Sequence, residues 1–163
     1  MKKLYLILIL LILALILINY YNETGFDFET KKVQINESEF NLPDNFVIES
    51  QRKNFVSLYD EDKNVSLEMT QLLNNTTIEN SFKRAANEIP TVNNETITMS
   101  NIEVYVTYRH TEYINSTQIF FEKDNHHYRI WGMNYSNEDK DYFSQAFNEI
   151  ISSLRPIDQG YIG

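Results

Sequence analysis

The chain has 163 residues, no cysteine and a formal net charge of −9. A surface with this negative excess repels nucleic acid and anionic lipid, so nucleic acid is excluded as a partner. The absence of cysteine excludes both the disulfide-stabilised class of secreted domains and lipoproteins anchored through a lipidated cysteine, so stability must come from packing alone.

The first predicted element is a membrane helix. Lys2 and Lys3 precede fifteen apolar residues, Leu4 to Ile18. At about 1.5 Å per helical residue the run spans roughly 22 Å, and about 27 Å if it extends through Tyr21, close to a hydrocarbon core of about 30 Å. The positive flank favours a cytoplasmic N-terminus. We therefore expect residues 1–21 to form a single-pass transmembrane signal anchor, with the rest of the chain extracellular.

The alternative for this segment is a cleaved secretory signal. Cleavage requires small residues at the end of the apolar run, whereas residues 19–23 are bulky or polar throughout. An uncleaved anchor is the better interpretation. The apolar run contains neither a Gly-x-x-x-Gly pattern nor a polar residue, which favours a lone tether over a helix that pairs with others.

A polar stretch without periodicity follows, and we expect residues 22–37 to be a stalk or linker. The domain is then predicted to span residues 38–156, beginning with an antiparallel meander. Its expected strands are residues 40–42, 46–50, 55–59 and 65–72. A helix should follow, with Thr76 and Glu79 forming a capping box ahead of an apolar stripe that ends at Pro90.

The second half of the domain repeats this order. Its expected strands are residues 95–99, 102–113, 117–122 and 127–133. Ser136 and Asp139 then form a cap for a last helix, whose apolar stripe runs from Tyr142 to Leu154 and must pack on a sheet. The sequence thus predicts one α+β domain, a mostly antiparallel sheet layered with two amphipathic helices, and a loose tail over residues 157–163.

Two segments carry a resemblance to a known family. The opening Phe40-Asn-Leu-Pro-Asp-Asn-Phe46 and the closing helix Phe147-Asn-Glu-Ile-Ile-Ser-Ser-Leu-Arg155, together with the element order, resemble the PsbP-like (Mog1/PsbP/DcrB) superfamily over roughly residues 38–156. The resemblance implies an antiparallel sheet covered by helices. Its members do unrelated work, so it implies no site residue and no activity.

The pattern Asn-x-Ser/Thr marks acceptors for N-glycosylation and occurs eight times, against roughly 2.6 expected by chance from this composition. All eight lie in the predicted linker or near turns and element ends, where a glycan is tolerated. The alternative is that these are loop asparagines that happen to precede hydroxyl residues. The glycosylation candidates are Asn22, Asn36, Asn64, Asn74, Asn75, Asn94, Asn115 and Asn134.

Two patterns were considered as metal sites. Asp60, Asp62 and Asn64 have the spacing that opens a calcium loop, but the sixth position lacks glycine and the twelfth lacks glutamate, which favours an acidic hairpin turn. Among the histidines, His126 and His127 are adjacent and should point to opposite faces of a strand, so both cannot easily reach one ion. We expect no metal and no cofactor.

Catalysis is also not expected. Gly132 is the only glycine of the predicted domain, so no nucleophile elbow or phosphate loop can be built from glycine-rich turns. The aromatic content is high, however, and alternation along residues 127–135 places Arg129, Trp131 and Tyr135 on one face of a strand. We predict a contact surface centred on Trp131, able to stack on a sugar ring or a peptide.

These features predict a function in outline. Beyond the anchor the chain carries 12 basic and 23 acidic residues, a charge of −11 that suits either solubility in a crowded envelope or a cationic partner. We expect a non-enzymatic extracellular surface glycoprotein of a prokaryotic, and more specifically archaeal, cell envelope, which binds an envelope protein or glycan or has a structural role. The alternative is an accessory subunit of a membrane protein complex.

Overall fold

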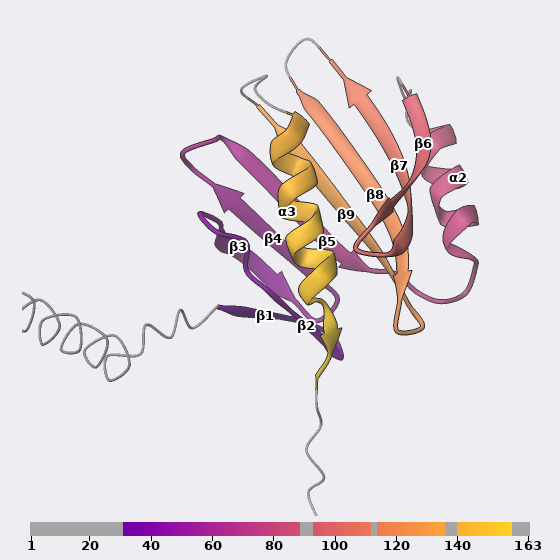
Figure 1. Ribbon diagram of the computed structural model, residues 1–163, viewed down its shortest axis with the longest axis horizontal. Coiled ribbons are helices and arrows are strands. Elements are labelled where there is room, and N and C mark those ends of the chain that lie inside the picture. The colour runs from indigo at the N-terminus through magenta and orange to yellow at the C-terminus, as the bar shows by residue number, and fades with distance from the viewer. Residues whose placement is uncertain (1–30, 89–92, 112–113, 136–139, 158–163) are drawn as a thin grey trace, which may run out of the picture. The chain divides into compact units, whose positions relative to one another are not determined.

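The computed structural model describes residues 31–88, 93–111, 114–135 and 140–157 (Figure 1). The expected anchor, residues 1–21, and the cap at Ser136 lie outside these residues, as does the tail beyond residue 157. No helix in the described part of the chain combines the length and the apolar character that crossing a membrane requires.

The observed elements follow the predicted order. They are β1 Lys32–Ile35, β2 Ser38–Asn41, β3 Val47–Arg52, β4 Phe55–Asp60, β5 Val65–Gln71, α2 Ile78–Glu88, β6 Asn93–Met99, β7 Ile102–His110, β8 Asn115–Lys123, β9 His126–Asn134, α3 Lys140–Ser153 and β10 Arg155–Pro156. β7 is shorter than predicted because Thr111 ends it: its backbone N–H and hydroxyl both donate to the carbonyl of Ile114, at 2.9 and 3.1 Å.

Seven strands form the main sheet in the order β3-β4-β5-β9-β8-β7-β6, and β1, β2 and β10 form a second, smaller sheet. Every pairing among these strands is antiparallel. The chain thus has the α+β architecture that the sequence predicts, with hairpins that bring β5 and β9 together in the middle of the main sheet.

Helix α3 covers one face of the main sheet (Figure 1). From Phe143 to Leu154 its apolar stripe is buried as predicted, and it packs on the strand residues that alternate toward it. The helical members of this core are Phe143, Ala146, Phe147, Ile150, Ile151 and Leu154, and the strand members include Val56, Leu58, Leu67, Met69, Val104, Val106, Ile119, Phe121, Tyr128 and Ile130.

Gly132 lets α3 approach β9 closely. A Cβ added there would lie 2.5 Å from Cδ1 of Phe143 and 3.0 Å from Cζ of Phe147. These two rings stack on each other with centroids 5.8 Å apart. Gly132, the only glycine of the predicted domain, therefore serves close packing, because its missing side chain provides the space that the two rings occupy.

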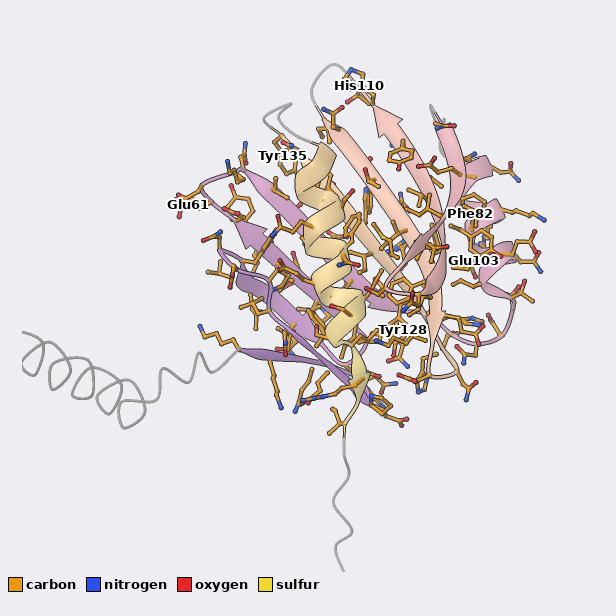
Figure 2. The ribbon with its side chains drawn as sticks, in the orientation of Figure 1. Glu61, Phe82, Glu103, His110, Tyr128 and Tyr135 are labelled. Carbon is orange, nitrogen blue, oxygen red and sulfur yellow. The ribbon has the colours of Figure 1, made fainter. Side chains whose placement is uncertain are left out.

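Helix α2 lies on the opposite face and contacts β7 and β8. Its ring contacts come from Phe82, whose centroid lies 5.3 Å from Tyr105 and 6.2 Å from Phe120 (Figure 2). The N-cap is Thr77 and not the predicted Thr76, because the hydroxyl of Thr77 accepts from the backbone N–H of Asn80 at 3.2 Å. The helix begins one residue later than the capping box implied.

The folded part begins before the predicted start at Ser38. Val33 and Ile35 are buried in the core, and β1 pairs with β2 from Lys32 onward. The stalk expected over residues 22–37 is therefore shortened at its C-terminal end. Several contacts join the small sheet to the rest of the domain. Among them, Ser38 Oγ and Tyr128 Oη share a buried 2.8 Å hydrogen bond, and α3 contacts β2.

Candidate functional site

One set of strand side chains in the main sheet points away from α3 and lies outside the ring contacts that Phe82 of α2 makes. We call it the open face, meaning the side chains of β4, β5, β9 and β8 that point away from α3. They are Ser57, Tyr59, Ser66, Glu68, Thr70, Ser116, Gln118, Arg129, Trp131 and Met133. Mostly polar residues, two aromatic rings and one guanidinium replace the aliphatic residues that fill the α3 side.

Trp131 lies in the middle of the open face. Strand pairing places Glu68 of β5 directly opposite it on one side and Gln118 of β8 directly opposite it on the other. Neighbouring strands are about 4.8 Å apart, so a carboxylate and a carboxamide flank the indole at the distance of one strand each. Trp131 and Glu68 remain partly exposed, whereas Gln118 is buried.

Arg129 is the second member of this centre. Its guanidinium carbon lies 6.0 Å from the centroid of the Trp131 ring, within the range of a cation–π interaction. Its Nη2 donates to the hydroxyl of Thr70 at 3.4 Å, which connects it to β5. The arginine and the tryptophan therefore act as one unit, held against the sheet by a ring contact and a hydrogen bond.

Several polar atoms of the open face have no hydrogen-bond partner within the described part of the chain. They are Ser66 Oγ, Arg129 Nε and Trp131 Nε1. A buried polar atom without a partner costs about 1–3 kcal/mol, and native proteins rarely leave several together. The polar groups around Trp131 thus have hydrogen-bonding capacity that the folded chain does not use.

The structure brings together two of the three residues predicted for the contact surface. Trp131 and Arg129 are in contact, as described above. Tyr135 is 42% exposed and follows the end of β9, where its hydroxyl lies 3.7 Å from the sulfur of Met133. Figure 2 shows Tyr135 at the end of the sheet opposite Tyr128. It borders the open face and does not belong to its centre.

No sequence pattern indicates Glu68, Gln118 and Ser66. Each lies on a strand whose alternation is visible, but their proximity to Trp131 depends on β5 and β8 flanking β9. Glu68 and Ser66 lie more than sixty positions from Trp131 along the chain, whereas Gln118 is only 13 positions away, across the β8–β9 hairpin. The only local signal is the run of polar residues at the start of β8, which is unusual in a central strand.

The histidines do not come together. His110 bonds the side-chain oxygen of Asn115, while His126 bonds Gln71 at 3.1 Å and His127 bonds Glu122 at 3.2 Å. Among the described residues no group of three histidine, aspartate or glutamate side chains is placed to hold a metal ion.

The acidic segment between β4 and β5 forms a hairpin turn. Asp60 is buried and its carboxylate accepts from the backbone N–H of Lys63 at 3.1 Å. Asn64 has a positive φ of 54°, which a tight turn requires. Asp60 therefore stabilises an acidic hairpin turn, which is the interpretation that the sequence favours over a calcium loop.

The sequons differ in accessibility. Asn22 lies outside the described residues, and Asn134 is buried on the α3 side with 3% exposure, so a glycan there would have to displace core residues. The amide of Asn74 is engaged, because it donates to the carbonyl of Asn125 at 2.6 Å and accepts from the N–H of His127 at 3.3 Å. The exposed sequons are Asn64, Asn74, Asn75 and Asn94, and the partly exposed ones are Asn36 and Asn115.

Solved structures share this architecture. A protein from Bacteroides thetaiotaomicron aligns with 82% of the chain at a TM-score of 0.58 and 11% identity, and the chain spans 50% of that protein's length. The solution structure of the cyanobacterial PsbP protein CyanoP from Synechocystis aligns with 81% of the chain and 95% of its own at a TM-score of 0.47 and 11% identity. The Bacteroides protein, the one of these two with a TM-score above 0.5, therefore shares the overall fold of this chain.

A further match is a Pseudomonas aeruginosa protein of unknown function, which aligns with 77% of the chain and 96% of its own at a TM-score of 0.41 and 11% identity. No protein-family model and no curated protein matches the sequence. At 11% identity, likeness to solved structures concerns the fold alone.

Proposed function

We propose that the chain is a membrane-anchored surface protein of a prokaryotic, more specifically archaeal, cell envelope, and that its PsbP-like domain is a non-enzymatic binding module. The observation that carries the binding role is the open face. A partly exposed Trp131 in contact with Arg129, flanked by polar groups without partners, is an arrangement suited to recognition.

The location rests on the sequence. The fifteen-residue apolar run behind Lys2 and Lys3 supports a single-pass anchor with the domain outside the cell, and the excess of sequons supports glycosylation there. The structure adds a ranking of those sequons. Asn75 and Asn94 have exposed side chains, whereas burial disfavours Asn134.

Intact mass of the protein recovered from native membranes tests this proposal. We expect a full-length chain with added glycan mass, and digestion of intact cells with an external protease should remove the domain. A chain lacking its first twenty or so residues would overturn the anchor, and protection from protease in intact cells would overturn the extracellular location. Hydrolysis of envelope-type substrates by the purified protein would overturn the non-enzymatic role.

The accessory-subunit alternative has a separate test. Extraction in a mild detergent should give the chain without other membrane proteins if the anchor is a lone tether. Co-purification of a defined set of membrane subunits would instead assign the chain to a complex.

A further inference from the structure

The centre of the open face combines three kinds of group. Trp131 is a partly exposed aromatic ring, Glu68 on one side is an acceptor, and Gln118 on the other side is both donor and acceptor. Glu68 forms neither a salt bridge nor a side-chain hydrogen bond with another described residue. The hydrogen-bonding groups therefore lie on both sides of the ring.

A pyranose sugar has the complementary chemistry. Its ring presents an apolar face of C–H groups, surrounded by hydroxyl groups that each donate and accept hydrogen bonds. An aromatic side chain can stack on the apolar face of the sugar ring. An acceptor on one side of it, and a group that both donates and accepts on the other, can form hydrogen bonds with the sugar hydroxyl groups.

Charge argues for a neutral ligand. Within the centre the carboxylate of Glu68 and the guanidinium of Arg129 carry opposite formal charges, so the surface around Trp131 has no net charge to select an anion or a cation. The part of the chain beyond the apolar run carries −11 overall, which disfavours acidic polymers.

The same face is poorly suited to a protein partner. Strand addition requires an unpaired sheet edge, but β5, β9 and β8 are each paired on both sides. The exposed large apolar residues that would anchor a protein are Val47, Ile48, Leu73 and Tyr135, and none of them belongs to the open face.

We propose that the open face is a carbohydrate-binding site, in which Trp131 stacks on a neutral pyranose unit while Glu68 and Gln118 bond its hydroxyl groups and Arg129 supports the indole. The inference rests on the proposed function, because it names the ligand class of the binding module suggested above. The ligand is a neutral glycan of the kind present at cell surfaces.

The chain's single tryptophan provides a direct readout. The full-length protein is produced in a host without N-glycosylation, so that its own glycans cannot compete, and is held in a detergent without a sugar headgroup. It is titrated with neutral hexasaccharides of glucose, mannose, galactose and N-acetylglucosamine. We expect at least one of them to produce a saturable change in Trp131 emission, and calorimetry to report the same affinity.

Variants test the assignment of residues. Glu68→Ala and Gln118→Ala should each weaken binding about tenfold or more, because each loses a hydrogen bond to the sugar. Glu61→Ala is the matched control, since Glu61 is an exposed glutamate in the β4–β5 turn, away from the open face (Figure 2), and should bind like the unsubstituted protein. Trp131→Phe, followed by calorimetry, keeps an aromatic ring in place and should weaken binding less than Trp131→Ala.

The outcomes separate this inference from the proposed function. Unchanged Trp131 emission with all four hexasaccharides overturns the carbohydrate site, as does a change that Glu68→Ala and Gln118→Ala leave intact, and neither result alters where the domain lies. Emission that responds only to peptides would assign the face to a protein partner and also overturn it. Conversely, protection from external protease would overturn the surface location without affecting a measured sugar affinity.

Discussion

Replacing Gly132 by alanine tests how closely α3 packs on the sheet. The added methyl group would lie 2.5 and 2.6 Å from two ring carbons of Phe143, closer than packed side chains allow. Phe143 is 3% exposed and Phe147 1%, so neither ring can turn into solvent. Overpacking of this kind costs about 1–3 kcal/mol.

A smaller effect opposes this cost. Gly132 does not have a positive φ, so alanine fits the backbone and reduces the entropy of the unfolded chain, which stabilises by about 0.4–1 kcal/mol. The net loss is therefore about 0–2.6 kcal/mol, centred on about 1.3 kcal/mol. For a domain of this size, a loss of about 1.5 kcal/mol lowers Tm by roughly 6 °C.

The measurement is urea unfolding of the full-length protein followed by circular dichroism, with Phe143→Leu as the second arm of a double-mutant cycle. Because the smaller leucine makes room for the methyl group, Phe143→Leu should cost less in the Gly132→Ala background than alone, with a coupling of at least about 0.5 kcal/mol. A gain in stability of Gly132→Ala over the unsubstituted protein, or strictly additive effects in the cycle, would refute the close packing of α3 on β9.

Three further predictions concern stability. Ile151→Ala removes a fully buried side chain of α3 and should lower the unfolding free energy by about 2–5 kcal/mol, whereas Leu73→Ala, 77% exposed, should change it by less than about 0.5 kcal/mol in the same urea assay. Burial raises the pKa of the Tyr108 hydroxyl from 10.0 to about 12, so the stabilisation that Tyr108 provides is present below pH 10 and is lost between pH 10 and 12. Between these two pH values the Tm of Tyr108→Phe should fall less than that of the unsubstituted protein. A hydrogen bond from Arg155 lowers the pKa of the Glu39 carboxyl below 4.5, so the stabilisation that Glu39 provides is present above pH 4.5 and is lost as the solution is acidified further. The Tm of Glu39→Gln should therefore depend less on pH below 4.5, and an acid dependence equal to that of the unsubstituted protein would contradict the Glu39–Arg155 pair.

The strands of the main sheet were predictable because each has a run of β-branched or aromatic residues between turn signals. β1 was not, since its four residues contain only two apolar side chains and adjoin a polar stretch. Its identity as a strand depends on β2, with which it pairs, and on the core that receives Val33 and Ile35. β10, with two residues, has no periodicity to detect.

The site was predictable only in part. Alternation along β9 separates Trp131 from Tyr128 and Ile130, but both sets contain large apolar residues, so the sequence does not say which set faces a helix. Gly132 decides this, because only the face without its side chain admits the rings of Phe143 and Phe147. The neighbours of Trp131 depend on strand order, which is set by contacts between distant parts of the chain.

The position of α3 and β10 at the end of the described chain affects how the protein is made. The apolar side of the sheet has no helical cover until residues 143–154 have left the ribosome, and β2 lacks its second neighbour until Pro156 has followed. Folding of the domain is therefore completed only after α3 and β10 have been synthesised. A chain that stops short of Phe143 leaves the apolar side of the sheet exposed to solvent, and quality-control proteases would degrade it.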